Sequence, residues 1–225
     1  MKWLAEHKDA YEGARCFVIG CGPSLANVDL SLLKDEVTFG VNGVYMIDGF
    51  KSTFYSTISA EYWRYHVAGI KSVRCERRFI PDDMKELGSD VPTTWLKVNR
   101  YPEPLVPESF SYDPTTVVQL GGTVIFVCLQ LAYYMGFTTA ILLGVDHNYD
   151  YEVVNNHITI RDTDTCHFRP DYSPPGRSFH YDIRHSDRAF MLANDAFSRG
   201  NRKIYNATIG TKLDIFEKIA LEDVL

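Results

Sequence analysis

The chain has 225 residues, of which 45% are hydrophobic and 13% aromatic, and this supplies enough apolar material for one sizeable core. Its formal charge of −6 at pH 7 excludes the basic field that holds nucleic acid by counterion release. The longest apolar run, at residues 123–132, falls well short of the roughly 20 residues that a membrane-spanning helix needs, so we expect no span.

The amino-terminal segment and the cysteines indicate the compartment. Residues 1–13 mix charged side chains with few apolar ones, unlike the apolar centre of a secretory signal, and we expect a cytoplasmic protein. The five cysteines are scattered without a CxxC pair or a regular spacing. Neither a disulfide framework nor a cysteine zinc site is therefore expected.

Short apolar runs rich in β-forming residues recur through the first hundred residues and predict buried strands. The first run, at 15–20, ends in the turn Gly20–Leu25, after which Asn27 or Asp29 can cap a short helix at 30–34. Further strands are expected at 37–41, 53–58, 73–80 and 95–98. Strands separated by short helical pieces indicate a parallel sheet.

The second half of the chain predicts one long buried helix and a long irregular segment. Residues 121–136 read as the helix, opened by two glycines and closed by a third, and residues 139–144 as another buried strand. Residues 150–181 are rich in Asp, Asn, Pro and His without periodicity, and we interpret them as a lid. A helix at 182–200 and a strand at 203–205 complete the pattern.

These elements predict a single nucleotide-binding α/β domain over residues 1–225, with a Rossmann-like, mostly parallel sheet flanked by helices and covered by the lid segment. Ligands of open α/β sheets bind beyond the carboxyl ends of the strands. The residues that follow the predicted strands are therefore the candidates for a functional site.

The turn after the first strand contains Gly20, Gly22, Pro23 and Ser24. Glycines at such a turn let backbone N–H groups approach a phosphate, and a helix N-terminus favours its charge. The turn lacks the full GxGxxG of dinucleotide folds and the GK[ST] of a P-loop, which disfavours NAD and Walker-type ATP sites. A turn that serves only to reverse the chain stays an alternative.

Polar residues lie at or just after the ends of three other predicted strands. Asn42 and Ser56 or Thr57 could hydrogen-bond a ribose or a base, or could simply cap helices. Asp146 could bind Mg²⁺ or a substrate hydroxyl, or could cap a turn. All of them would lie at one edge of a parallel sheet.

The lid and the start of the helix after it combine histidines, arginines and tyrosines. His180 or His185 could act as a general base, because an imidazole pKa of about 6.5 suits the removal of a hydroxyl proton. Arg177 and Tyr181 could neutralise a leaving phosphate without a metal, or could belong to surface salt bridges. The histidines there lack the HxH or HxxxH spacing that places two imidazoles on one metal, so the pattern does not favour a metal site.

Five stretches of the chain resemble known proteins. Residues 18–25 (VIGCGPSL) and 38–42 (TFGVN) resemble the opening of the bacterial sialyltransferases of the Campylobacter type, which use CMP-sialic acid, and of the 6-hydroxymethylpterin diphosphokinase-like proteins often found in surface-polysaccharide gene contexts. Residues 122–149 are similar to the helix, strand and G-I-D pattern of the sialyltransferases, and residues 177–186 to the stretch that holds their catalytic histidine. Residues 203–216 look more like the diphosphokinase-like group.

The resemblance implies a role for individual positions. His185 or His180 would match the general base of the family. Tyr149 or Tyr151 would match phosphate-binding tyrosines. The full set assigned to the nucleotide is Gly20, Cys21, Gly22, Pro23, Ser24, Asn42, Ser56, Gly121, Gly122, Asp146, Tyr149 and Tyr151.

These features predict a nucleotide-dependent transferase, most concretely a sialyltransferase-like glycosyltransferase that takes a nucleotide-sugar donor and a small-molecule or glycan acceptor and needs no metal or other cofactor. One alternative is a pyrophosphokinase that moves diphosphate from ATP to 6-hydroxymethylpterin with Mg²⁺, for which Asp146 is the candidate ligand. The other is a nucleotide-binding protein without catalysis. Homo-oligomerisation stays open.

Overall fold

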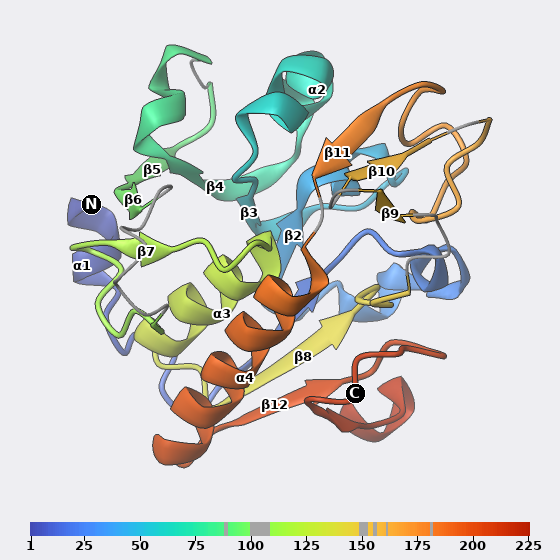
Figure 1. The fold of residues 1–225 in the computed structure, drawn as a ribbon. Coiled ribbons are helices and arrows are strands. Elements are labelled where there is room, and N and C mark those ends of the chain that lie inside the picture. The colour runs from blue at the N-terminus through green and yellow to red at the C-terminus, as the bar shows by residue number, and fades with distance from the viewer. Residues whose placement is uncertain (88–89, 100–108, 149–152, 155–156, 161, 181) are drawn as a thin grey trace.

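The computed structural model describes residues 1–225 except 88–89, 100–108, 149–152, 155–156, 161 and 181 (Figure 1). Its main sheet is built from β1 (Arg15–Ile19), β2 (Thr38–Val41), β3 (Ser52–Ser56), β4 (Cys75–Pro81), β5 (Thr93–Leu96), β8 (Thr139–Leu143), β12 (Lys203–Asn206) and β13 (Glu217–Lys218). Their order is β13-β12-β8-β1-β2-β3-β4-β5, and every neighbouring pair is parallel. The predicted α/β fold is therefore confirmed.

The helices pack on this sheet and bury one hydrophobic core. They are α1 (Lys2–Glu6), α2 (Ala60–Ser72), α3 (Val124–Tyr134) and α4 (Ile183–Arg199). Figure 1 shows α3 and α4 side by side in front of the sheet, which explains why α3 is apolar on nearly every face. Among the helices that the described residues form, none is long and apolar enough to cross a membrane.

Short elements complete the described part of the chain. The 3₁₀ turns are Pro23–Asn27, Leu30–Leu33, Asn42–Met46, Asp82–Leu87 and Leu221–Val224. A two-stranded parallel sheet joins β6 (Val98–Asn99) to β7 (Val118–Gln119), and an antiparallel sheet joins β9 (Val153–Val154), β10 (His157–Thr159) and β11 (Ser178–His180). The antiparallel sheet and residues 162–177 belong to the expected lid segment.

The order in which successive strands are added to the sheet changes direction between β1 and β8. From β1 the strands run outward as β2, β3, β4 and β5, whereas β8, β12 and β13 lie on the other side of β1. The loops that leave the carboxyl ends of β1 and β8 thus diverge to opposite sides, and such a switch point is where open α/β sheets hold their ligands.

Local structure differs from the sequence expectations in several places. The strand expected at 95–98 is divided, because β5 ends at Leu96 and Val98 begins β6 of the two-stranded sheet. The helix expected at 30–34 is the 3₁₀ turn Leu30–Leu33, capped at Ser31 N by Asp29, which was one of the two predicted caps. Helix α2 was not among the predicted elements. Its buried side chains Tyr62, Trp63 and Ile70 share one helical face and Ser59 caps its N-terminus, so the sequence did carry a signal for it.

Gln130 is a polar side chain in the middle of the apolar helix α3, and it is fully buried. Its Oε1 accepts hydrogen bonds from the backbone N–H groups of Ser111 and Gln119, both at 3.1 Å. Its Nε2 donates to the carbonyls of Gln119, at 2.7 Å, and Phe126, at 3.1 Å. One amide thus satisfies the backbone of two loop segments that α3 would otherwise bury without partners.

The Gln130→Leu variant is expected to lower the free energy of unfolding by about 3 kcal/mol, because buried donors and acceptors lose their partners while the side-chain volume is kept. Urea unfolding followed by circular dichroism measures this loss. The matched control is Gln119→Leu, which keeps the backbone bonds of residue 119 and is expected to cost less than about 1 kcal/mol. Equal losses in the two variants would show that the Gln130 amide is not what stabilises these loops.

Candidate functional site

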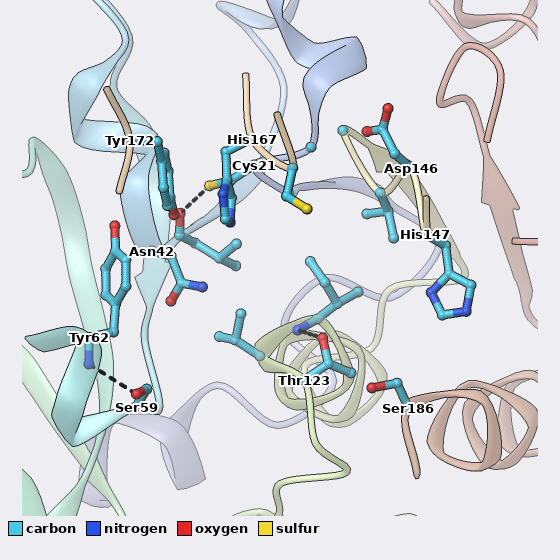
Figure 2. A pocket seen from close by; sticks show the side chains of 18 of the residues that line it. Cys21, Asn42, Ser59, Tyr62, Thr123, Asp146, His147, His167, Tyr172 and Ser186 are labelled. Carbon is cyan, nitrogen blue, oxygen red and sulfur yellow. Dashed lines mark hydrogen bonds between the residues drawn. The ribbon is translucent and has the colours of Figure 1, made fainter. Parts of the chain in front are cut away.

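A cavity of about 280 Å³ lies at the carboxyl ends of β1, β2, β3 and β8, at the switch point (Figure 2). Its lining comes from four places: the turns after these strands, the start of α2, the starts of α3 and α4, and the 162–177 segment. The residues with polar side chains at its wall are Cys21, Asn42, Ser59, Glu61, Tyr62, Thr123, Asp146, His147, Asn148, Cys166, His167, Tyr172, Ser173, Arg177 and Ser186.

The glycines of the first turn are required by contact with the turn after β8. A Cβ on Gly20 would lie 2.4 Å from the carbonyl oxygen of Gly144, and a Cβ on Gly22 would lie 1.9 Å from Asp146 Oδ2. The Asp146 carboxylate accepts hydrogen bonds from Ser24 N at 2.9 Å and from Ser24 Oγ at 2.7 Å. Asp146 therefore caps the first 3₁₀ turn from across the sheet, and the glycines make room for it.

The carboxy-terminal segment fixes the position of Asp146 from the other side. Thr208 Oγ1 accepts a hydrogen bond from Val145 N at 3.0 Å, and Thr211 Oγ1 donates to Val145 O at 2.8 Å. Lys212 N donates to Asp146 O at 2.9 Å. Burial raises the pKa of the Asp146 carboxyl, although the bonds from Ser24 oppose this.

Asn42 presents amide hydrogens to the cavity. Its backbone takes a positive φ of 44°, and its Oδ1 accepts a hydrogen bond from Thr57 Oγ1 at 2.9 Å. The bond to Thr57 turns the amide nitrogen toward the cavity, as Figure 2 shows. Thr57, rather than Ser56, is thus the polar residue after β3 that supports the site.

Helix α3 points its N-terminus at the cavity. Gly121 and Gly122 have φ of 56° and 69°, a conformation that glycine adopts without strain, and Thr123 Oγ1 caps the helix by accepting from Ile125 N at 3.3 Å. Gly122 lines the cavity, whereas Gly121 packs behind it, where a Cβ would meet Phe126 and Ala189. The positive end of the helix dipole therefore faces the cavity.

His185 lies in the first turn of α4, at the edge of the cavity. A Cβ on Gly122 would be 3.1 Å from His185 Nδ1, so the imidazole covers a residue of the cavity wall. The side chain is exposed, and Ser186 beside it is buried and lines the cavity. The cap of α4 is Asp182, whose Oδ1 accepts from His185 N at 3.2 Å.

Residues 162–177 pack over the first glycine turn. Phe168 N donates to Cys21 O at 3.0 Å, and Tyr172 Oη accepts from Gly43 N at 3.1 Å. His167 stacks on Tyr172, with ring centroids 3.8 Å apart, and its Nδ1 lies 2.8 Å from Asp164 Oδ2. The described part of the expected lid thus forms one wall of the cavity.

Buried Asp164 is the anchor of this wall. Burial alone would raise the pKa of its carboxyl, but hydrogen bonds from His167, Ser173 and Cys166 N outweigh burial and lower it. The carboxylate is therefore ionised at neutral pH, and it holds the His167 ring in place.

Arg177 is a buried cation of the cavity wall, only 9% exposed. Its guanidinium lies 4.6 Å from the ring centre of Tyr65 and 5.4 Å from that of Tyr62. One of its terminal nitrogens donates to His66 Nε2 at 2.8 Å, while its buried Nε has no hydrogen-bond partner among the described residues. Among the residues with described side chains, no carboxylate forms an ion pair with it.

The structure brings together only part of the predicted site. Gly20, Cys21, Gly22, Asn42, Gly122, Asp146 and Arg177 line the cavity. Ser56 does not, because its side chain is fully buried and its Oγ donates to Phe79 O at 2.9 Å. Pro23, Ser24 and Gly121 support the wall from behind. Tyr149, Tyr151 and Tyr181, and the side chain of His180, lie outside what the structure describes.

Cys21 was expected beside the nucleotide, and the structure gives its thiol a structural bond. Its Sγ donates to Val41 O at 3.2 Å, and burial raises the pKa of the thiol to about 11. The thiol is therefore protonated at neutral pH and is a poor nucleophile.

Several cavity residues were not assigned to the site from the sequence. His147 Nε2 lies 2.8 Å from Asp187 Oδ1, and the pair ties the turn after β8 to α4. Tyr62 comes from the unpredicted helix α2, as does His66, which contacts the cavity residue Arg177. The two His–Asp pairs, His147 with Asp187 and His167 with Asp164, are 40 and 3 residues apart in the sequence, and only folding shows which carboxylate each histidine meets.

The described residues do not form a ready-made metal site. No group of three His, Cys, Asp or Glu side chains among them could hold a metal ion. Asp146 lies in the cavity, but both of its oxygens accept hydrogen bonds from Ser24. A Mg²⁺ ion bound there would have to take most of its ligands from a substrate and from water.

Comparison with proteins of known sequence and structure finds a distant structural likeness. No model of a known protein family matches the chain, and no curated protein matches it. The solved structure of the sialyltransferase CstII from Campylobacter jejuni, in complex with the substrate analogue cytidine-5′-monophosphate, has a TM-score of 0.49 and 13% sequence identity and covers 93% of this chain and 86% of that chain. The likeness to the diphosphokinase-like proteins stays a prediction.

The cavity predicts a pH dependence of stability through His66. Burial first, and then the charges of Arg177 and His167, lower the pKa of His66 to about 4. Between pH of about 6.5 and 4 the unfolded chain would bind a proton at His66 that the folded chain does not, so folding loses stability as pH falls through this window. The His66→Gln variant should lose less of its melting temperature between pH 7 and pH 4.5 than the wild type does. Identical losses would contradict the assignment.

Proposed function

We propose that this protein is a nucleotide-dependent transferase, and that the cavity binds the phosphate of a nucleotide-sugar donor. The observation that carries the proposal is Arg177, a buried guanidinium with an unsatisfied Nε and no carboxylate partner among the described side chains. A buried charge of this kind is costly unless an opposite charge meets it. A ligand phosphate in the cavity would supply that charge.

Two other donors support an anion at the same place. Asn42 turns its amide nitrogen into the cavity, and α3 directs its N-terminus there. Amide hydrogens and helix N-termini are common phosphate ligands. The cavity volume of about 280 Å³ is near the lower end for small-molecule sites, so it suits part of a nucleotide sugar rather than a macromolecule.

The two sides of the cavity support a separation of roles in the transfer. Figure 2 shows Tyr62 and Tyr172 on one side and His147 and Ser186 on the other. Arg177 belongs with Tyr62, where it would stabilise the leaving phosphate. A base should act from the opposite side, where the acceptor hydroxyl arrives.

His185 is our candidate for that base. It is exposed at the cavity edge beside Gly122, whereas the side chain of His147 is 8% exposed and is tied to Asp187. In the proposed step the acceptor hydroxyl oxygen forms a bond to the sugar carbon, and its proton passes to His185. The bond between that carbon and the phosphate oxygen breaks, and the phosphate leaves with the electron pair.

A panel of nucleotides tests binding directly. CMP, CDP, UDP, GDP, ADP and ATP are each added with and without Mg²⁺, and we expect at least one sugar-donor nucleotide to raise the melting temperature without the metal, because a ligand of the folded state stabilises it. A shift that requires both ATP and Mg²⁺, and is abolished by EDTA, would favour pyrophosphate transfer instead. No shift with any nucleotide would contradict the proposal.

Arg177→Gln should weaken the binding of the nucleotide that stabilises the protein in this panel by about tenfold to a hundredfold, because it removes the cation and keeps an uncharged polar side chain. Titration calorimetry measures the dissociation constant. The matched control is Arg199→Gln, since the Arg199 side chain is 75% exposed on α4 and pairs with Asp195. An Arg177 variant that binds as the wild type does would remove the main support for the site.

His185→Gln should lower kcat for sugar transfer by about 10²- to 10⁴-fold and leave nucleotide affinity nearly unchanged, because a general base acts on the acceptor and not on the donor. The comparison variant is His147→Gln, which we expect to keep most of kcat once its thermal stability is checked. Loss of kcat in the His147 variant alone would place the base on His147. A donor complex that forms without turnover in the wild type, for every acceptor tried, would favour a binding protein.

A further inference from the structure

We propose that His66 is a positioning residue: its neutral imidazole accepts a hydrogen bond from Arg177 and so holds the guanidinium in the cavity, ready for an anion. The inference rests on the proposed function only for the identity of the anion as a nucleotide phosphate. The orientation of Arg177 by His66 is a property of the folded chain and can be tested without any ligand.

The first observation is the backbone of α2. The helix runs over Ala60–Ser72, but His66 has φ of −117° and ψ of 20°, outside the helical range. The residue is neither proline nor glycine, so the kink needs another cause, and side-chain interactions outside the helix are one. Both ring nitrogens of His66 make such interactions: Nε2 with Arg177 and Nδ1 with Tyr45 Oη, each at 2.8 Å.

The chemistry of arginine fixes the tautomer of His66. A guanidinium has five N–H donors and no acceptor, so His66 Nε2 must carry the lone pair. The ring proton then lies on Nδ1, which donates to the hydroxyl of Tyr45. A protonated His66 would direct an N–H group and a positive charge at Arg177. In agreement with this, burial and the neighbouring charges of Arg177 and His167 depress the pKa of His66.

The surroundings of the ring leave it little freedom. Tyr62 stacks on His66, with ring centroids 4.3 Å apart and an interplanar angle of 23°. Tyr172 lies 6.2 Å from it on the side of the 162–177 wall. Tyr45 is pressed against α2 where Gly69 leaves room, since a Cβ on Gly69 would come within 2.1 Å of the tyrosine ring. The groups that face His66 are thus three tyrosines, Tyr45, Tyr62 and Tyr172, and two basic side chains, Arg177 and His167.

A fixed arginine binds an anion better than a mobile one. An unconstrained arginine loses rotamer entropy when a ligand immobilises it, and that loss reduces affinity. His66, Tyr62 and Tyr65 hold the Arg177 guanidinium before any ligand arrives, yet they leave its Nε without a partner. Because none of these three neighbours is a carboxylate, the positive charge of Arg177 is oriented without being neutralised.

Nitrogen NMR of the wild-type protein tests the tautomer without a ligand. Between pH 5 and 8 we expect the His66 ring to stay neutral, with Nδ1 protonated and Nε2 unprotonated, and the Arg177 Nε–H signal to be protected from exchange. A His66 ring that titrates near its ordinary pKa of about 6.5, or that carries its proton on Nε2, would overturn the inference whether or not any nucleotide binds.

Two variants test the positioning role. His66→Gln keeps an acceptor near the place of Nε2, and His66→Leu removes it. We expect the Leu variant to lose the protection of the Arg177 Nε–H signal and to bind inorganic pyrophosphate about tenfold more weakly, while the Gln variant stays close to the wild type. The control is His7→Gln, because His7 bonds to Trp3 O and lies away from the cavity.

The outcomes separate this inference from the proposed function. An ordered Arg177 in the Leu variant, with unchanged pyrophosphate affinity, would overturn the positioning role even if nucleotides bind. If the Leu variant fails to fold, the wild-type tautomer decides alone. If the wild type shows the expected tautomer but binds neither pyrophosphate nor any nucleotide, the proposed function fails while the hydrogen bond from Arg177 to His66 stands.

Discussion

The contact between the turns after β1 and β8 is the constraint on which the site depends. Gly20 N donates to Leu143 O at 2.7 Å and Gly22 N to Gly144 O at 2.8 Å, so the two turns continue the pairing of their strands beyond the sheet. Neither turn could approach so closely with a side chain at Gly20 or Gly22. From this junction the first 3₁₀ turn leaves on one side and Asp146 reaches across to cap it, and the cavity opens between them.

The fold was predictable where a local pattern decides the local structure. The runs at 15–20 and 139–144 are apolar and end at glycine, and they became the central strands β1 and β8. The helix at 121–136 was equally clear, because only a helix buried on all sides has such a sequence. Helix α2 was missed although its buried side chains Tyr62, Trp63 and Ile70 share one helical face, because its few apolar residues are mixed with polar and charged ones.

The site was predictable only as far as a residue's place at a strand end determines its role. Asn42 and Asp146 follow strands of a parallel sheet, and both reached the cavity. Ser56 also lies at a strand end, but its hydroxyl donates a hydrogen bond to Phe79 O in β4. No local sequence pattern reveals that bond. The glycine turn shows a different limit. Glycines there were expected for approach to a phosphate, and the structure shows that Gly22 is needed for the Asp146 carboxylate.

The charge of the cavity wall is opposite in sign to the net charge of the whole chain. The protein carries a formal charge of −6, yet the cavity wall holds a buried arginine that no described carboxylate neutralises. The nearby carboxylates of Asp146 and Asp164 are each occupied by hydrogen bonds from the protein. The guanidinium of Arg177 is therefore available to a ligand, and for this reason we assign the cavity to an anion.

The most direct test of this account is to map where a nucleotide binds. The nucleotide that stabilises the protein most is titrated into isotope-labelled protein, and the Asn42 side-chain amide, the Arg177 Nε–H group and the backbone amides of Val124 and Ile125 are followed by NMR. The account predicts that these signals shift together at one dissociation constant, because all of them line the same cavity. Shifts confined to other parts of the protein, with these signals unchanged, would contradict it.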